Sequence, residues 1–311
     1  MNLKSILKMS RKKINPIWLL VILHICVLIL AVLFIKKGKT VPPMETNKIS
    51  VIPIDGVIAM ESGSLRSGQT VDGIVETIKR IGEDRNTRAV ILRINSPGGS
   101  VGAVQEIYRA LKKIKAQGKT IVASFGEVSA SGGYYIACAA DKIVVNPGTL
   151  TGSIGVIMEL PNVQGLLTKF GIKFETIKSG AMKDSGSPFR EMTAEERKYF
   201  SSLIMDAYGQ FFQAVKEGRK LGDKQLKPLA DGRVFTGQMA IKNKLADSIG
   251  GLDEAIETAK SLTGLSGTKP NIVYHRGRTS LDRLLQLLNK SPLEKLENMG
   301  PSEMKLMYLM Q

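Results

Sequence analysis

A serine in a turn of small residues is the most reactive group in this sequence. Ser131 lies in the run Ala130-Ser131-Gly132-Gly133-Tyr134-Tyr135, which feeds an apolar, helix-like segment. Backbone N–H groups at a helix start lack intrahelical partners and lie at the positive end of the dipole, so they stabilise an alkoxide or an oxyanion. An N-cap hydroxyl without chemistry is the alternative, and Ser129 competes for the role. Ser131 is preferred because it directly precedes the glycine pair.

The base that would activate this serine is not expected to be a histidine. The chain holds two histidines, His24 inside an apolar run and His275 in a late basic stretch, and neither is well placed to serve Ser131. A Ser-His-Asp triad is therefore disfavoured, and a lysine base remains. Because an ordinary lysine has a pKa of about 10.4, such a base must be desolvated before it is neutral near neutral pH. We expect neither a metal nor a cofactor.

A second glycine-rich turn follows another strand-like run. The segment Asn95-Ser96-Pro97-Gly98-Gly99-Ser100 leads into a helical pattern, and its backbone N–H groups can form an oxyanion hole. An ordinary turn with Ser100 as helix cap is the alternative. Two such junctions, one of them carrying a serine, favour the functional interpretation.

The net charge of +16 does not indicate nucleic-acid binding. Eight of the 44 basic residues lie within residues 1–40, which hold no acidic residue, and the rest of the chain keeps a charge of +8 without a dense arginine run. This distribution fits a protein that works beside an anionic membrane. The two cysteines, Cys26 and Cys138, provide no disulfide framework.

Residues 17–35 are almost all apolar and long enough to cross a bilayer. Lys36 and Lys37 follow without a small-residue cleavage site, so the segment predicts an uncleaved transmembrane anchor. More basic residues precede it than follow it, which favours a cytoplasmic N-terminus and a catalytic body outside the cytoplasm, at the cell membrane. We expect a basic N-terminus at residues 1–16, the anchor at 17–35 and a linker at 36–47.

The body alternates short β-branched runs with helical stripes, which predicts an α/β fold with right-handed crossovers and a mainly parallel sheet. Thr193 and Glu196 predict a capping box that opens a long helix. The strands are expected at residues 49–54, 89–95, 120–124, 142–145 and within 231–237, and helices around 71–78 and 104–114. The catalytic domain is expected at 48–265, followed by a tail at 266–311 with one short helix near residues 281–288.

Four motifs, in this order, resemble the signal peptide peptidase A family. The resemblance covers roughly residues 48–260 and is that of the short, single-repeat bacterial form with one N-terminal anchor. The motifs are Asn95-Ser96-Pro97-Gly98-Gly99, Ala130-Ser131-Gly132-Gly133-Tyr134-Tyr135, Thr149-Leu150-Thr151-Gly152-Ser153-Ile154-Gly155-Val156 and Lys178-Ser179-Gly180-Ala181-Met182-Lys183-Asp184. The resemblance implies a Clp-protease/crotonase-like fold of repeated ββα units and a serine peptidase with a Ser/Lys dyad.

The resemblance also implies a role for each matching residue. The nucleophile falls on Ser131, the general base on Lys183, and a hydroxyl that orients the lysine on Ser153. Gly98, Gly99 and Gly132 would bind the oxyanion and the substrate backbone. Lys178 is the rival base, at the end of an apparent strand at residues 174–177. Because a nearby carboxylate would oppose loss of the lysine proton, we expect the Asp184 side chain to point away from the base.

The function implied by the family is degradation of released signal peptides in or at the membrane. The expected partners are peptide substrates, the membrane and further copies of the chain, in a ring or dome for which eight subunits is one option; no nucleic acid is expected. Related proteases that trim particular membrane proteins, a crotonase-type acyl-CoA enzyme and an inactive scaffold remain as alternatives. The apolar C-terminal run at residues 304–311 is either a packing element or a segment that enters a substrate groove.

Overall fold

The computed structural model describes residues 23–25, 47–60, 70–275 and 307–310, and the chain divides into two compact units, residues 1–45 and 46–311. The sheet and the helices that cover it belong to the second unit. Among the described residues, no helix combines the length and the apolar character needed to cross a membrane. The predicted anchor at 17–35 lies outside these residues except for residues 23–25, and the predicted short helix near 281–288 lies wholly outside them.

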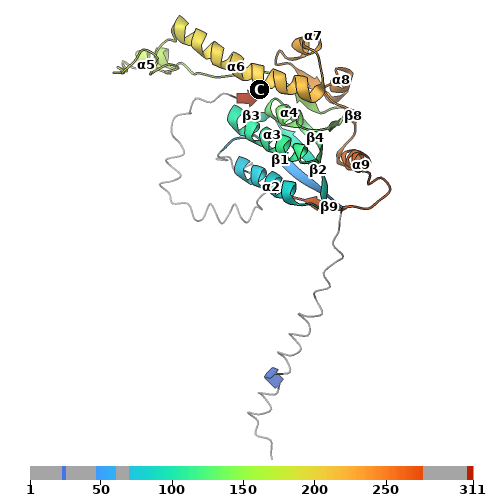
Figure 1. Ribbon diagram of the computed structural model, residues 1–311. Coiled ribbons are helices and arrows are strands. Elements are labelled where there is room, and N and C mark those ends of the chain that lie inside the picture. The colour runs from blue at the N-terminus through green and yellow to red at the C-terminus, as the bar shows by residue number, and fades with distance from the viewer. Residues whose placement is uncertain (1–22, 26–46, 61–69, 276–306, 311) are drawn as a thin grey trace, which may run out of the picture. The chain divides into compact units, whose positions relative to one another are not determined.

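A mainly parallel sheet with helices on both faces forms the body, as predicted (Figure 1). Its described strands run in the order β7-β6-β4-β2-β1-β9, with β5 pairing β4 and β8; among them, β7 is the one that runs antiparallel to its neighbour. A separate antiparallel pair joins β3 and β10. The strands are β1 (Lys48–Asp55), β2 (Thr87–Ser96), β3 (Gly98–Ser100), β4 (Thr120–Ala130), β5 (Lys142–Val145), β6 (Leu150–Gly152), β7 (Val234–Thr236), β8 (Ser248–Ile249), β9 (Asn271–Tyr274) and β10 (Met307–Leu309).

The helices divide between the two faces of the sheet. They are α2 (Val71–Glu83), α3 (Val101–Ala116), α4 (Gly132–Ala137), α5 (Gln164–Lys169), α6 (Ala194–Arg219), α7 (Asp223–Leu226), α8 (Gly237–Lys242) and α9 (Leu252–Leu262), with a 3-10 turn at Lys227–Leu229. Successive strand residues alternate between two cores, because side chains along a strand point to opposite faces. On β2, for example, Val90 and Leu92 join the core under α2 and α3, whereas Ala89 and Ile91 join the core under α9.

Strand β4 is longer than predicted and changes partners along its length. Residues 122–124 pair with β5, whereas residues 128–130 pair with β6. The pairing with β2 shifts register between Ile94 and Ser96, where the Asn95 carboxamide oxygen accepts hydrogen bonds from the backbone N–H groups of Glu127 and Val128. Beyond this bulge, β4 pairs with β6 instead of β5, and Ser131 follows the last residue of β4.

The long helix α6 begins with the predicted capping box. The Thr193 side chain accepts from the Glu196 N–H, and the Glu196 carboxylate accepts from the Thr193 N–H. Its C-terminal half packs on the core through Ala207, Phe211 and Val215. We call residues 158–193, which precede the helix and include α5, the arm; Figure 1 shows α5 at the N-terminal end of α6. None of the arm residues is buried, and Ile177 is 97% exposed.

One prediction about secondary structure is wrong, and one is extended by the structure. Residues 174–177 form no strand, because their side chains are exposed and no neighbouring strand of this chain pairs with them among the described residues. The tail after residue 265 is more ordered than predicted. Its first part supplies β9, which pairs parallel with β1, and its last part supplies β10, which pairs with β3.

Candidate active site

Ser131 lies at the turn between β4 and α4 in an uncommon backbone conformation. Its φ of 50° and ψ of −116° are rarely adopted by residues other than glycine. The Ser131 N–H donates to the Gly152 carbonyl and the Ser131 carbonyl accepts from the Tyr135 N–H, both at 2.8 Å, so the backbone is held at both ends. The residue is 1% exposed, and its Oγ has no hydrogen-bond partner within the described part of the chain. A buried hydroxyl without a partner is costly in a structural role and is typical of functional sites.

Ser153 is the parallel counterpart of Ser131 on the neighbouring strand. Ala130 and Gly152 are in register at the ends of β4 and β6, so the two serines that follow them lie at the same edge of the sheet. Ser153 also has a φ of 50°, and its N–H donates to the Arg233 carbonyl at 2.9 Å. The two hydroxyls predicted to act together are therefore positioned by one strand pair.

The predicted oxyanion glycines meet at the start of α4. The space around each glycine shows how close the backbones are: a methyl group on Gly98 would lie 2.8 Å from the Gly132 nitrogen, and one on Gly132 would lie 3.0 Å from the Gly99 nitrogen. Gly98 has a φ of 116°, and its own N–H donates to Ser96 Oγ at 3.1 Å. The Gly98 N–H is therefore engaged, which corrects the prediction that it serves the oxyanion; the N–H groups of Gly99 and Gly132 remain as candidates, and only glycine fits the crowded backbone.

The C-terminal strand β10 occupies the space beside these glycines. It pairs antiparallel with β3, with Tyr308 opposite Gly99, and the Met310 N–H donates to the Pro97 carbonyl at 2.9 Å. On its other side, Met307 exchanges two backbone hydrogen bonds with Ile157, of 3.1 and 3.2 Å. Since hydrogen-bonded pairs alternate along an antiparallel ladder, the Tyr308 carbonyl faces the Gly99 N–H. A methyl group on Gly98 would overlap that carbonyl oxygen and would also crowd the Gly132 nitrogen, so both lie next to Gly98.

The Tyr308 side chain fills an aromatic pocket under α6. It is fully buried, stacks on Tyr135 with ring centroids 5.1 Å apart and contacts Phe211 at 4.9 Å. Its hydroxyl donates to the Ala207 carbonyl at 2.9 Å. Burial raises the pKa of the Tyr308 hydroxyl, so it stays a neutral donor. The pocket beside Ser131 therefore accepts a large aromatic side chain with a polar tip.

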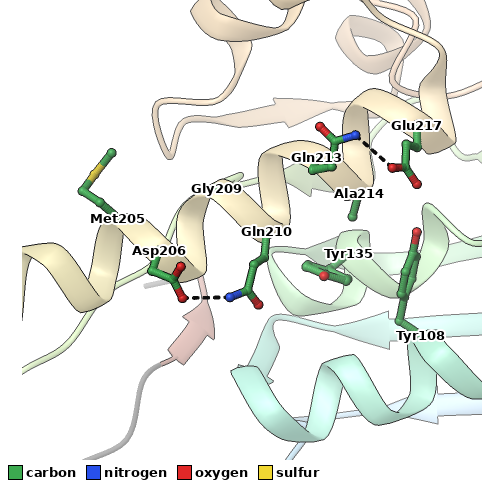
Figure 2. Close-up of a pocket in the computed structure, with 9 residues that line it drawn as sticks. All are labelled: Tyr108, Tyr135, Met205, Asp206, Gly209, Gln210, Gln213, Ala214 and Glu217. Atoms are coloured by element: carbon green, nitrogen blue, oxygen red, sulfur yellow. Dashed lines mark hydrogen bonds between the residues drawn. The ribbon is translucent and has the colours of Figure 1, made fainter.

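A second, open pocket lies between α3 and α6, and Tyr135 is one of the residues that line it (Figure 2). It has a volume of about 520 Å³, and Tyr108 and Tyr135 form its floor. On its α6 wall, Gln210 donates to Asp206 and Gln213 donates to Glu217, each at 2.9 Å. Tyr135 thus forms a wall shared by this pocket and the Tyr308 site.

The two candidate lysines lie on the arm and differ in their partners. Lys178 Nζ donates to Asp184 Oδ1 at 2.5 Å and to the Ala181 carbonyl at 3.1 Å, so its ammonium is engaged. Lys183 is exposed, and neither a hydrogen bond nor an ion pair of its Nζ occurs among the described residues. Within one chain, the structure does not bring Lys183 to Ser131, whose hydroxyl lacks any such partner.

The Asp184 carboxylate binds Arg190 and Lys178 and makes no hydrogen bond to Lys183 among the described residues, which agrees with the expectation for this side chain. Arg190 binds its carboxylate through two nitrogens, Nε to Oδ2 at 2.9 Å and Nη2 to Oδ1 at 2.8 Å, and Lys178 adds a third contact. The hydrogen bonds from Arg190, followed by that from Lys178, hold the pKa of Asp184 well below its usual range. The histidine expectation also agrees with the fold, because His275 Nε2 lies 3.1 Å from Ser50 Oγ on β1 rather than beside Ser131.

Sequence reasoning missed Ile157 and Arg190 in this region, and the ion pair that Glu196 makes. Ile157, which pairs with the C-terminal strand, and Arg190 belong to no motif. The capping box gave Glu196 a local role only. An ion pair between a loop and a helix start has no fixed spacing, so sequence patterns do not reveal it.

Comparison with known proteins now places the chain. The family Peptidase family S49 matches residues 113–266, and the family Clp protease matches residues 59–148. A protein of Synechocystis sp. assigned as a protease is 43% identical over 73% of this chain and 79% of its own length. The chain belongs to peptidase family S49. It is a serine peptidase with a Clp-protease-like α/β fold.

Further S49 relatives share the peptidase assignment. A protein of Enterococcus faecium assigned as the signal peptide peptidase SppA is 39% identical over 76% of this chain and 69% of its own length. Protease 4 of Haemophilus influenzae is 33% identical over 70% of this chain, which spans 35% of that longer protein.

Proposed function

We propose that this S49 peptidase is a membrane-anchored endopeptidase that degrades released signal peptides with a Ser131/Lys183 dyad. The observation that carries the nucleophile is the buried Ser131 Oγ, which has no partner in the described chain and lies beside two converging glycine N–H groups. The apolar N-terminal segment, at residues 17–35, supports the anchor, and the relative named for signal peptides supports the substrate.

In this proposal, an extended peptide binds where β10 lies. The peptide pairs with β3 on one side and with Ile157 on the other, and the aromatic pocket under α6 receives one of its side chains. The chain's own end then stands in for a substrate, with Tyr308 in the specificity pocket and its carbonyl at the oxyanion donors. The bond that would be cleaved is the one between Tyr308 and Leu309.

The chemistry follows from these positions. The neutral amine of Lys183 takes the proton of Ser131 while Oγ attacks the peptide carbonyl carbon. The N–H groups of Gly99 and Gly132 stabilise the oxyanion, and the resulting ammonium returns a proton to the leaving amine. Water then hydrolyses the acyl-enzyme with the same lysine as base. Ser153 orients the lysine amine toward Ser131.

Lys183 reaches Ser131 from a neighbouring copy in this proposal. The lysine is exposed on the arm, and the arm carries unburied apolar side chains such as Phe170, Phe174 and Ile177 that contact with a second copy would cover. A closed ring of such contacts gives every Ser131 a lysine from the next subunit. Assembly then supplies the desolvation that a lysine base requires.

Purified full-length protein with Ser131→Ala, Lys183→Ala and Lys178→Ala substitutions tests the assignment. The first two variants should lose peptide hydrolysis with unchanged circular dichroism, whereas Lys178→Ala should keep substantial activity. A fluorophosphonate should label the wild type at Ser131 and leave Ser131→Ala unlabelled, which a crotonase-type acyl-CoA enzyme would not show. Activity in Lys183→Ala with loss in Lys178→Ala would contradict the choice of base.

The substrate proposal has its own measurement. Mass-spectrometric mapping of cleavage sites in a library of signal peptides and soluble peptides, with Ser131→Ala as control, should show cleavage after large aromatic or apolar residues in the signal peptides. Cleavage confined to soluble, charged sequences would contradict the signal-peptide assignment and leave the serine chemistry intact.

A further inference from the structure

A compact cluster of four charged side chains lies next to Lys183; Lys178, Asp184 and Arg190 come from the arm, and Glu196 comes from the first turn of α6. Lys178 and Arg190 both bind Asp184, and Arg190 also binds Glu196 through Nη1 to Oε2 at 3.0 Å and through Nη2 to Oε1. The side chains of Asp184 and Glu196 are 11% and 2% exposed, so the carboxylates are shielded although the arm is open. The four charges cancel. The cluster thus forms a neutral unit that is complete within one chain.

This cluster ties the turn that carries Lys183 to the start of α6. The turn is closed by backbone hydrogen bonds from Lys183 N–H to the Gly180 carbonyl and from Ser185 N–H to the Met182 carbonyl, of 3.1 and 3.2 Å. Arg190 Nη2 also donates to the Asp184 carbonyl at 3.2 Å. Since Glu196 is the capping-box residue of α6, Arg190 links the turn to the first turn of a 26-residue helix.

Within this cluster, Asp184 binds Arg190 and Lys178 rather than Lys183. Asp184 follows Lys183 directly, and a lysine side chain is a flexible four-carbon stem that can reach a free carboxylate on the next residue. Such a pair would favour the protonated amine and would oppose its use as a base. With Arg190 and Lys178 in place, three donors already occupy the carboxylate oxygens. The other acidic residue within residues 178–191 is Glu191. Its side chain accepts a hydrogen bond from Asn162 at 3.1 Å and from no lysine among the described residues.

We propose that Arg190 is a positioning residue for Lys183, which anchors the turn of residues 180–185 to α6 and withholds the Asp184 carboxylate from the Lys183 amine. This inference rests on the proposed function, in which Lys183 is the general base. Lys178 assists as the second cation on Asp184. The rival lysine of the sequence analysis thereby acquires a role that does not require it to lose a proton.

The test compares peptide hydrolysis against pH for the assembled wild-type protein, Arg190→Gln, Asp184→Asn and the double variant. In Arg190→Gln, the Asp184 carboxylate loses two of its three donors and should pair with Lys183, which moves the midpoint of the rising limb of kcat/KM to higher pH. A midpoint that is higher by about one pH unit lowers activity at pH 7.5 about tenfold, because activity below the midpoint falls by a factor of about ten per pH unit. The alkaline plateau should fall less than about threefold. Removing the carboxylate as well should return the midpoint to its wild-type position.

Two further variants keep the test decisive. Arg190→Lys retains the charge but loses the two-nitrogen grip on Asp184, so it should give an intermediate shift if Arg190→Gln fails to assemble. Lys178→Ala should shift the midpoint in the same direction by a smaller amount. A loss of activity in Arg190→Gln that is equal at every pH, and that Asp184→Asn does not correct, would overturn the inference. If Lys183→Ala itself keeps activity, the proposed base is wrong; if it is inactive and the Arg190→Gln midpoint is unchanged, only the role of Arg190 is wrong.

Discussion

Tyr308 combines two properties that a bound substrate residue would have. Its backbone pairs with β3 opposite Gly99, and its side chain is fully buried against Tyr135 and Phe211. Burial of a whole tyrosine near a chain end is a strong anchor, since a large aromatic side chain contributes a few kcal/mol when it leaves water. The residue is therefore both the best evidence for the binding groove and a candidate for cleavage.

Self-cleavage follows at this residue. On long incubation, the wild-type protein should be cleaved between Tyr308 and Leu309, because the Tyr308 carbonyl faces the Gly99 N–H proposed as an oxyanion donor. Intact-mass analysis measures the loss, and Ser131→Ala serves as the inactive control. Tyr308→Asp should retain its full length, since a carboxylate is excluded from the aromatic pocket. Equal masses for the wild type and Ser131→Ala would leave β10 as a packing strand only.

At the scale of elements, strand β3 depends on Gly98 and Gly99, where the Cβ of any other residue would overlap backbone atoms. A methyl group on Gly99 would overlap the Ile58 carbonyl oxygen, whereas a methyl group on Gly102, in the first turn of α3, would meet nothing within 4 Å. Backbone contact of this kind cannot be relieved by rotating a side chain. The position of β3, and with it the Gly99 N–H, is set by that contact.

The matched pair Gly99→Ala and Gly102→Ala tests this dependence. Gly99→Ala should reduce kcat by about 100-fold or more, the effect of losing one oxyanion donor, because the added methyl displaces β3. Gly102→Ala should leave activity within about twofold of the wild type and add slight stability, since alanine favours the helix. Peptide hydrolysis and thermal unfolding measure both variants. Full activity in Gly99→Ala would remove β3 from the oxyanion site.

The start of helix α6 should respond to acid. Hydrogen bonds from Arg190 and then from the Thr193 N–H lower the pKa of Glu196 from its ordinary value of 4.5 to about 2. A lowered carboxyl pKa contributes stability that is fully present above the ordinary value and is lost as pH falls toward the folded one. The stabilising effect of Glu196 should therefore disappear between about pH 4.5 and 2.

Melting temperatures of the wild type, Glu196→Gln and Glu195→Gln across this range provide the measurement. The gap between the wild type and Glu196→Gln should be largest near neutral pH and should narrow as pH falls from 4.5 to 2. Glu195 is the matched control, an exposed acid in the same first turn, and its variant should follow the wild type throughout. A gap that stays constant with pH would show that the Glu196 charge does not matter to the helix.

The sequence predicts most of the sheet and of α6 because their signals are local. Short β-branched runs mark β1, β2 and β5, and the capping box of Thr193 and Glu196 marks the first residue of α6. Local sequence signals fail where pairing with residues far apart in the sequence determines the structure. Residues 174–177 resemble a strand in sequence but pair with no strand among the described residues. Strands β9 and β10 form because β1 and β3, distant in sequence, pair with them.

The candidate site shows the same division. Two glycine-rich turns and Ser131 are visible in the sequence, since turn chemistry depends on residue types in one short segment. The choice between Lys178 and Lys183 is not visible, because it depends on which lysine Asp184 binds, and the Arg190–Glu196 pair that fixes Asp184 joins a loop to a helix.

At the scale of the whole molecule, the separation of Ser131 from Lys183 within one chain predicts complementation. Equal amounts of Ser131→Ala and Lys183→Ala subunits, mixed under conditions of subunit exchange, should regain about a quarter of the wild-type sites, because a working site needs the serine of one variant and the lysine of the other. Peptide hydrolysis after verified mixing measures the gain. Native mass spectrometry confirms that mixed assemblies exist. Zero activity in such assemblies would contradict the shared site.

The conformation of Ser131 has a consequence for the molecule's own durability. A residue with a side chain held at a φ of 50° and a ψ of −116° costs about 1–3 kcal/mol, whereas glycine adopts such angles freely. The Ser131→Gly protein should therefore be inactive and melt at a higher temperature than the wild type, unlike Ser131→Ala, which keeps the strain. Selection for peptidase activity has then acted against thermal stability at this position, and a more durable protein would be one that has given up its chemistry.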